Sequence, residues 1–303
     1  MAHFVKIACV QFATQASRGA ADAPKLVLNE LKAALEELKG YGVQLAVFCE
    51  GVEAYGTPVD LAEDAAKPGP FLQAYAAFAQ DQNCHVAGSV KLREGGRAYN
   101  SIAFLGPDGR VLGAYHKTNL THREIEWGLT SGPGAKIVET AVGKLGGIVC
   151  FDLNFEPLRK EYKALRPDIL CFASMYHGGL VQGMWAYDCR SFFASALPFM
   201  GCGVLDPFGR EQAATDCYSK VAMATVNLDR EIIHLDYNRE KFAEIRRKYL
   251  GEAVIDIPPN VGSALLYSLT HKRRAMDIVR EFELELLDDY FERALADNAK
   301  NKG

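Results

Sequence analysis

The chain has 303 residues, of which 49% are hydrophobic and 24% are charged, and its formal net charge is −4. This composition is ordinary for a globular protein with a large core. The negative charge argues against a nucleic-acid or anionic-membrane partner, since either needs a clustered basic face. No apolar run approaches the roughly 20 residues that cross a bilayer, and the N-terminus lacks a signal-peptide pattern. We therefore expect a cytoplasmic protein.

Eight cysteines are spread along the chain, without a Cys-x-x-Cys pair or a Cys/His cluster at zinc spacing. In a chain of this length without a secretion signal, most of them should be reduced, and we expect no bound metal. Cys9, Cys49 and Cys171 lie inside apolar strands and are expected in the core. The glycine-rich stretches lack the strand–GxGxxG–helix context of a dinucleotide site, so we expect no cofactor.

The first third of the chain alternates apolar strands with amphipathic helices. Asp22 is a plausible N-cap for the first helix, Pro24 fits its first turn, and Gly40 fits its end. Apolar residues recur there at helical spacing. The expected elements are a strand over 5–11, a helix over 22–40, a strand over 43–49, a helix over 69–83 and a strand over 85–92.

Two turn sequences predict hairpins in the remainder. GPDG at 106–109 lies between apolar strands over 98–105 and 111–116, and DPFG at 206–209 has the same form. The other expected elements are strands over 136–140, 145–150, 169–173 and 221–228, helices over 157–164, 183–196 and 239–249, an irregular segment over 251–265 and a charged helix over 275–296.

Single strands that alternate with helices indicate βαβ units, whereas the hairpins indicate antiparallel strands in the same sheets. Two mixed sheets packed face to face, with helices outside, would bury the nearly continuous apolar strands on both faces. We expect one α/β domain over residues 1–265. Residues 266–303 would form a helical tail that packs on this domain or on a partner subunit.

Three of the expected strands end next to residues whose side chains can take part in catalysis. Cys150 ends one strand just before a helix-compatible stretch, Glu50 follows a second strand, and Lys117 follows the hairpin strand. A thiol near a helix N-terminus is expected to have its thiolate favoured. Together the three residues predict a nucleophile assisted by an acid/base group and a cation.

Four short motifs in order make the chain resemble the nitrilase superfamily of carbon–nitrogen hydrolases. They are FCE at 48–50, YNS at 99–101, GAYHK at 113–117 and GIVCFDLNF at 147–155. The resemblance covers roughly residues 4–240. It implies a four-layer αββα sandwich, a Glu–Lys–Cys triad and hydrolysis through a thioester acyl-enzyme.

Under this resemblance each triad residue has a role. Cys150 would be the nucleophile, and Glu50, favoured over its neighbour Glu53, would take the thiol proton and later activate water. The Lys117 ammonium would stabilise the oxyanion together with the backbone N–H of Phe151.

A second glutamate commonly joins such a site. Glu124 and Glu126 both lie in the loop after Lys117, and we favour Glu126 for its spacing to Gly132. It would orient Lys117 and the substrate amide. Other candidates for the substrate pocket are Tyr55, His122, Arg123, Asn154, Tyr176 and His177.

The resemblance implies hydrolysis of a small linear amide with release of ammonia. Nitrile-hydrolysing members usually carry Trp-Glu after the nucleophile, whereas this chain has Phe151 and Asp152. Members acting on N-carbamoyl amino acids often carry arginines where this chain has Leu153 and Asn154, and Arg123 or His122 would have to replace them. Nitrile and N-carbamoyl substrates remain alternatives.

Two interpretations from other classes are weaker. The first is a binding or scaffold protein whose hydrolase fold has lost its activity, and the presence of all three triad residues argues against it. The second is a thiol-redox protein, which would need a resolving cysteine near Cys150 in the chain. We further expect a homodimer or a dimer-based assembly that pairs through helices 157–164 and 183–196. The second of these helices would carry a surplus of large apolar side chains, namely Met184, Trp185, Tyr187, Phe192 and Phe193.

Overall fold

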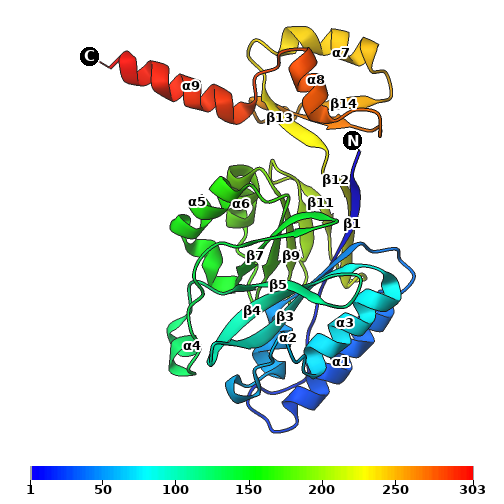
Figure 1. Ribbon diagram of the computed structural model, residues 1–303, viewed down its shortest axis with the longest axis vertical. Helices are drawn as coiled ribbons and strands as arrows, with labels where there is room; N and C mark the ends of the chain where they lie inside the picture. Colours follow the sequence, from blue (N-terminus) through cyan, green and yellow to red (C-terminus); the bar gives the residue numbers. More distant parts are fainter. Residues whose placement is uncertain (1, 303) are drawn as a thin grey trace. The chain divides into compact units, whose positions relative to one another are not determined.

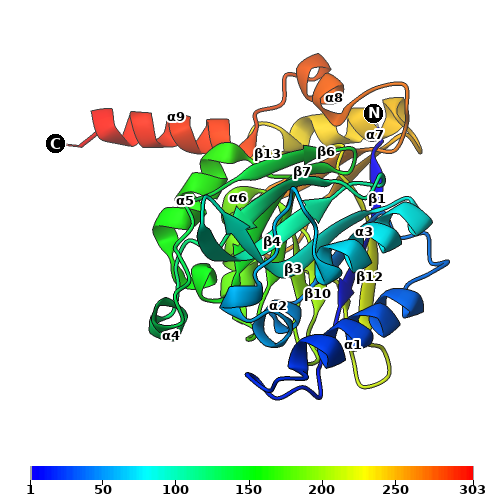
Figure 2. The same cartoon turned by 60° about the horizontal axis from the view of Figure 1, so that its bottom comes forward.

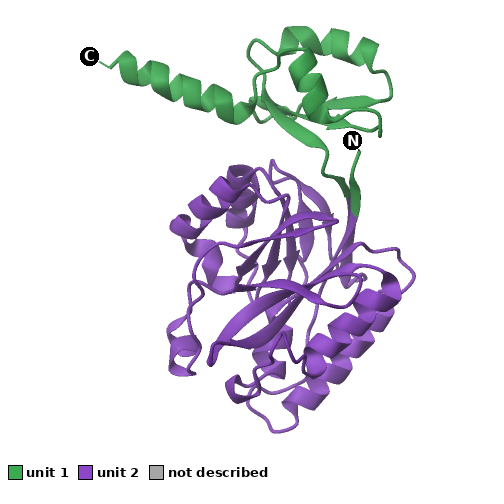
Figure 3. Cartoon of the chain, in the orientation of Figure 1, with its two compact units in different colours: residues 1–5, 226–303 green, residues 6–225 purple. Residues whose placement is uncertain are grey.

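The computed structural model of the chain describes residues 2–302 and divides into two compact units (Figure 3). The larger unit comprises residues 6–225. The smaller unit joins the N-terminal segment up to Val5 to the segment from Val226 onward. The two units are described separately below.

One six-stranded sheet has the order β12-β1-β2-β3-β4-β5. In this sheet β1, β2 and β3 are parallel, and β3, β4 and β5 are antiparallel. Parallel strands need crossover connections, and helices supply them here. The strands are β1 (Phe4–Val10), β2 (Leu45–Phe48), β3 (His85–Glu94), β4 (Arg97–Leu105), β5 (Val111–His116) and β12 (Val221–Asn227).

The second six-stranded sheet has the order β11-β10-β9-β8-β7-β6 and the same plan. Strands β7, β8 and β9 are parallel, whereas the strands on either side of them are antiparallel. The strands are β6 (Ile137–Thr140), β7 (Gly143–Val149), β8 (Ile169–Ala173), β9 (Phe192–Ala196), β10 (Gly203–Leu205) and β11 (Glu211–Ala214).

Helices cover the outer faces of the two sheets (Figures 1 and 2). Helices α1 (Ala23–Glu37) and α3 (Pro70–Gln82) pack together beside the first sheet, and α5 (Glu156–Leu165) and α6 (Leu180–Cys189) pack together beside the second. On the inner faces, β4 and β5 contact β7, and β2 contacts β8 and β9. The expected four-layer αββα sandwich of two mixed sheets is confirmed.

The predicted hairpins are both present. In the turn between β4 and β5 the Gly109 N–H donates to the Gly106 carbonyl at 2.8 Å, and Gly109 has φ of +76°. The turn between β10 and β11 repeats this with Gly209, whose N–H donates to the Asp206 carbonyl at 2.8 Å. A glycine is needed where the chain adopts such a positive φ.

The expected helix over 183–196 is wrong in its second half. Helix α6 ends at Cys189 because Arg190 adopts a left-handed conformation with φ of +57°. The chain then enters β9, a fully buried strand that pairs with β8 and contains Phe192 and Phe193. These rings therefore belong to the core and cannot form a helix-borne interface. The homodimer stays a prediction with fewer residues to support it.

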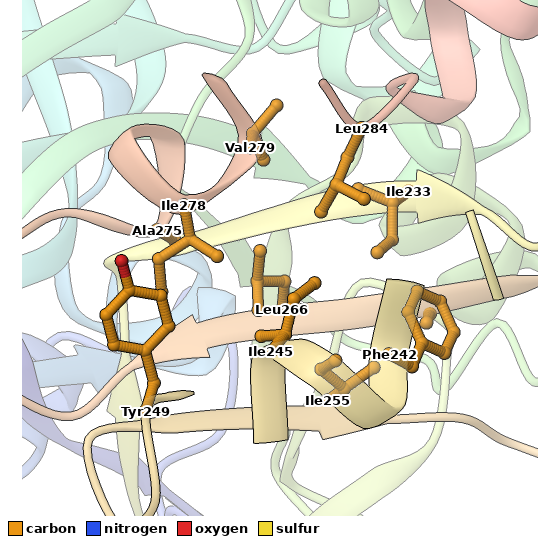
Figure 4. Packing of buried hydrophobic residues seen from close by; sticks show 11 residues of the cluster. Ile233, Phe242, Ile245, Tyr249, Ile255, Leu266, Ala275, Ile278, Val279 and Leu284 are labelled. Carbon is orange, nitrogen blue, oxygen red and sulfur yellow. The ribbon is translucent and has the colours of Figure 1, made fainter. Parts of the chain in front are cut away.

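The smaller unit has a core of its own (Figure 4). Its antiparallel sheet has the order β13-β15-β14, and side chains from α7 and α8 pack against the strands. The expected domain end at residue 265 falls inside β15, and the segment expected to be irregular holds two strands. The elements are β13 (Arg230–His234), η3 (Arg239–Lys241), α7 (Phe242–Lys248), β14 (Ala253–Asp256), β15 (Ser263–Ser268), α8 (Ala275–Glu281) and α9 (Leu287–Lys300).

Short helices complete the larger unit and matter for the site. They are α2 (Glu50–Gly56), η1 (Val59–Leu61), α4 (His122–Glu126) and η2 (Cys150–Asn154). Within residues 2–302 no helix combines the length and apolar character needed to cross a membrane.

The close approach of the two sheets gives a stability prediction. A Cβ added at Gly147 on β7 would lie 2.6 Å from the Cβ of Tyr115 on β5. Because overpacking a core commonly costs about 1–3 kcal/mol, Gly147→Ala should lower the free energy of unfolding by that order in urea titrations. Gly183→Ala is the matched control, since a Cβ there meets no atom closer than 3.7 Å and alanine favours a helix. Equal stabilities of the two variants would contradict the packing.

Candidate active site

The ends of three strands bring Glu50, Lys117 and Cys150 to one cavity of about 330 Å³. Glu50 opens α2 with one residue between it and β2, Lys117 directly follows β5, and Cys150 opens η2 directly after β7. The first two come from one sheet and the third from the other. The site predicted from the strand ends is thus assembled at the edge where the two sheets meet.

Lys117 is the centre of the charge cluster in this cavity. Its side chain is 1% exposed, and its Nζ donates to Glu50 Oε1 at 3.0 Å and to the two Glu124 carboxylate oxygens at 2.9 and 2.8 Å. Burial alone would lower the pKa of Lys117, but the charges of Glu50 and Glu124 raise it above its ordinary value. The ammonium is therefore charged at neutral pH.

Asn100 on β4 joins the two carboxylates and was not predicted as a site residue. Its Nδ2 donates to Glu50 Oε1 and to Glu124 Oε1, each at 2.9 Å. The second oxygen of Glu50, Oε2, is buried and has no hydrogen-bond partner among residues 2–302. One oxygen of Glu50 is thus held in place, and the other is left for a proton from the cavity.

Glu124, and not the expected Glu126, is the second glutamate of the site. Thr121 caps α4: its Oγ1 accepts from the Glu124 N–H at 3.3 Å, while the Thr121 N–H donates to Glu124 Oε2 at 2.9 Å. This reciprocal pair is a capping box, and it turns the Glu124 carboxylate inward. Residues two apart on a helix point in roughly opposite directions, so Glu126 is exposed. Burial would raise the pKa of Glu124, but Lys117 and its hydrogen bonds lower it.

Cys150 has a strained backbone, with φ of +48°. Such a conformation is uncommon for a residue other than glycine, and it persists only where its surroundings hold it. Asp152 supplies part of that hold, since its carboxylate accepts from the Tyr115 hydroxyl at 2.8 Å and the Asn119 N–H at 2.7 Å. Trp185 on α6 adds another contact by donating Nε1–H to the Leu153 carbonyl at 2.8 Å.

The surroundings of Cys150 favour the protonated thiol over the thiolate that the helix N-terminus was expected to favour. Desolvation and then the negative charge of Glu50 raise the pKa of the thiol to about 12, while Lys117 and the Met175 N–H act in the opposite direction. Desolvation is the largest of these effects, and the Lys117 ammonium does not offset it together with the charge of Glu50. Moving the thiol proton to Glu50 leaves the net charge unchanged, so the sulfur can become a nucleophile by that transfer.

The pocket residues predicted from the sequence are only partly brought together. Arg123 lines the cavity of Cys150, and Tyr55 lines a neighbouring one. The other four, His122, Asn154, Tyr176 and His177, lie outside both linings. Asn154 instead donates to the Phe151 carbonyl at 3.1 Å and the Tyr176 hydroxyl at 2.9 Å.

The cavity also contains residues that the sequence did not reveal as part of it. These are Arg18, from the loop after β1, and Ala54, Thr121, Trp127, Leu129 and Met175. Glu53, named earlier only as a rival of Glu50, lines it too and forms an ion pair with Lys91. No periodic pattern in the sequence marks such residues as part of a cavity. Over residues 2–302, no group of three or more His, Cys, Asp or Glu side chains is arranged to hold a metal ion.

Comparison with known proteins identifies the family. The family described as carbon–nitrogen hydrolase matches residues 6–231, which include every residue of the cluster. The chain belongs to the carbon–nitrogen hydrolase family. The resemblance seen in the sequence motifs is thereby confirmed, and the matched segment covers the whole of the larger unit.

Relatives of this carbon–nitrogen hydrolase include amidases and nitrilases. It is 24% identical over 255 residues to the chloroplastic omega-amidase of Arabidopsis thaliana, covering 72% of this chain and 69% of the relative. It is 29% identical over 213 residues to a bifunctional nitrilase/nitrile hydratase of Oryza sativa subsp. japonica, covering 59% of each. The structure of an amidase from Nesterenkonia sp. aligns with a TM-score of 0.60 and 19% identity, over 82% of this chain and 97% of that one, which supports the fold.

Proposed function

We propose that this carbon–nitrogen hydrolase cleaves a small linear amide through a thioester on Cys150 and releases ammonia. The observation that carries the proposal is the shared cavity, in which a strained cysteine meets Glu50, Lys117 and Glu124. Such a cysteine with an adjacent base is the arrangement that nucleophilic catalysis requires.

The first step would be attack of the Cys150 sulfur on the amide carbonyl carbon. The thiol proton goes to Glu50, whose Oε2 is without a hydrogen-bond partner among the described residues. Because the pKa of the thiol is raised to about 12, this transfer has to accompany the attack. Glu50 is suited to it because Lys117 and Asn100 fix its other oxygen.

Negative charge then develops on the carbonyl oxygen. We assign its stabilisation to the Lys117 ammonium and the backbone N–H of Phe151, as the sequence motifs implied. Lys117 is already charged and already positioned by Glu124, so little reorganisation is needed when the oxyanion forms. Glu124 is a positioning residue in this scheme, because it acts through Lys117.

Collapse of the tetrahedral intermediate breaks the C–N bond. Glu50 returns its proton to the departing nitrogen, which leaves as ammonia, and the acyl group remains on sulfur as a thioester. Glu50, again a carboxylate, then takes a proton from a water molecule that attacks the thioester carbonyl. Release of the carboxylic acid and return of the proton to Cys150 complete the cycle.

Two features favour an amide over the alternative substrates. The residues after Cys150 are Phe151 and Asp152, where nitrile-hydrolysing members usually have Trp-Glu. Asn154 stands where N-carbamoyl-hydrolysing members often have an arginine, and its amide is engaged with Phe151 and Tyr176. The relatives named as omega-amidases agree with an amide substrate but do not decide which one.

The proposal is tested by ammonia release from a panel of linear amides, nitriles and N-carbamoyl amino acids. We expect turnover of at least one amide, and loss of at least about 10³-fold in Cys150→Ala because the nucleophile is gone. Cys217→Ala is the matched control, since Cys217 is an exposed free thiol outside the cavity, and it should keep full activity. Substantial turnover by Cys150→Ala, or turnover of nitriles alone, would overturn the proposal.

The two neighbouring glutamates give a second test. Glu124→Gln should reduce kcat for the amide by about 10²-fold or more, since Lys117 loses a charged partner that positions it. Glu126→Gln, two residues away and exposed, should remain within about twofold of the unmodified protein. Thermal unfolding of both variants controls for loss of fold. Equal kcat values for the two would contradict the role given to Glu124.

A further inference from the structure

The charged residues of the site and its nucleophile come from different sheets. Glu50, Lys117 and Glu124 lie in the segments that follow β2 and β5 of the first sheet, whereas Cys150 follows β7 of the second. The ion pairs of Lys117 with the two glutamates therefore fix residues of the first sheet relative to one another. The position of the sulfur relative to the ammonium has to be set by a contact across the two sheets.

Asp152, which is not part of the described cavity lining, makes such a contact. It belongs to η2 and is fully buried. Its Oδ1 accepts from the Asn119 N–H at 2.7 Å and from Asn119 Nδ2 at 3.0 Å, and its Oδ2 accepts from the Tyr115 hydroxyl at 2.8 Å. Tyr115 stands two residues before Lys117 and Asn119 two residues after it. The carboxylate thus holds the chain on both sides of the ammonium.

The same carboxylate also holds the turn that carries the nucleophile. The N–H of Val149, immediately before Cys150, donates to Asp152 Oδ2 at 3.2 Å. Three of the four donors to Asp152 are N–H groups, which cannot accept a hydrogen bond, so two acceptor oxygens are needed to match them. Burial raises the pKa of Asp152 to about 6, while the hydrogen bonds from Asn119 and Tyr115 act in the opposite direction. The group is therefore a carboxylate at neutral pH.

Close packing around Tyr115 leaves little room for movement at this contact. The Tyr115 side chain lies against β7, where a Cβ added at Gly147 would come within 2.6 Å of the Tyr115 Cβ. Its hydroxyl also accepts from the N–H of Thr118, the residue after Lys117, at 3.3 Å. Because a close-packed interior transmits strain, a displacement of Asp152 would displace the backbone beside Lys117 as well.

We propose that Asp152 is a positioning residue, which places the Cys150 sulfur relative to the Lys117 ammonium by joining the turn of the nucleophile to both sides of the lysine. The inference rests on the proposed amide hydrolysis and adds a residue to it. That reaction requires the ammonium beside the carbonyl group that the sulfur attacks. A misplacement of about 1 Å can cost on the order of 10²-fold in rate, so a residue outside the cavity can control kcat.

Kinetics with a hydrolysed amide give the first test. Asp152→Asn keeps the size of the side chain but replaces one acceptor oxygen by a donor, and it should lower kcat at least about tenfold with KM within about threefold. Asp206→Asn is the matched control, because Asp206 is another buried carboxylate that accepts from a backbone N–H, that of Phe208 at 2.8 Å. It lies in the hairpin turn between β10 and β11, outside the described cavity lining, and the variant should keep kcat within about twofold.

Labelling of Cys150 gives a second test that needs no substrate. Tyr115→Phe/Asn119→Ala removes both side-chain donors while the charge of Asp152 stays. Iodoacetamide labelling of Cys150 at about pH 9, read by peptide mass spectrometry, should slow at least about threefold, because the ammonium no longer lies where it favours the forming thiolate. Labelling of Cys217, an exposed free thiol, should keep its rate. A merely loosened fold would expose Cys150 and speed its labelling instead.

The two tests separate this inference from the proposed reaction. Equal kcat values for Asp152→Asn and Asp206→Asn, an effect on KM alone, or labelling of Cys150 that is unchanged or faster would overturn the role of Asp152 and leave hydrolysis by Cys150 intact. If the unmodified protein hydrolysed no amide, the labelling would still decide. Asn119→Ala alone removes one hydrogen bond and keeps Tyr115, so it replaces the double variant if that does not fold, with labelling slowed at least about 1.5-fold.

Discussion

The buried ammonium of Lys117 is the charge on which the site depends. An ion removed from water costs several kcal/mol unless it is paired and hydrogen-bonded, and Lys117 meets this condition through Glu50 and Glu124. These partners begin α2 and lie within α4, segments far apart in the sequence. The same ion pairs therefore stabilise the buried lysine and fix the Glu50 carboxylate and the Lys117 ammonium relative to each other.

The cluster also decides how Cys150 can become reactive. Burial of the sulfur and then the negative charge of Glu50 raise the pKa of the thiol despite the nearby Lys117 ammonium, so a free thiolate is disfavoured. Transfer of the thiol proton to Glu50 removes the charge that opposes the thiolate at the moment it forms. In this account the positive φ of Cys150 directs the sulfur into the cavity, while general-base transfer supplies its nucleophilicity.

Sequence patterns predicted the two sheets and the meeting of Glu50, Lys117 and Cys150 in one cavity because both follow from strands. Buried strands are visible as apolar runs, and the residue at the end of each one, Glu50, Lys117 or Cys150, is placed by the sheet itself. Glu126 was preferred to Glu124 although a signal for Glu124 existed: Thr121 and Glu124 have the spacing of a capping box, which aims the glutamate back toward the N-cap. The helix predicted over 183–196 was too long because the chain turns at Arg190. An arginine gives no sequence signal for the left-handed conformation that this residue adopts.

Other features of the site and of the domain organisation are not predicted by any local sequence pattern. Asn100 stands in a motif that was noticed, but its bridge between two carboxylates depends on α2 and α4 folding over β4. Arg18 and Trp127 come from separate loops and meet only in the folded protein. The boundary between the two units follows from a separate core around β13, β14 and β15, and core membership is a property of packing rather than of composition.

The most direct test of this account is the protonation state of Cys150 at rest. Thiolate absorbance near 240 nm, measured as the difference between the unmodified protein and Cys150→Ala, reports this one group while the pH is raised. Because burial and the charge of Glu50 raise the pKa of the thiol, the account predicts no thiolate signal from Cys150 at neutral pH, and none until well above the ordinary thiol pKa of about 8.5. A thiolate already present at neutral pH would contradict it and would show that Lys117 outweighs burial and Glu50 together at the sulfur.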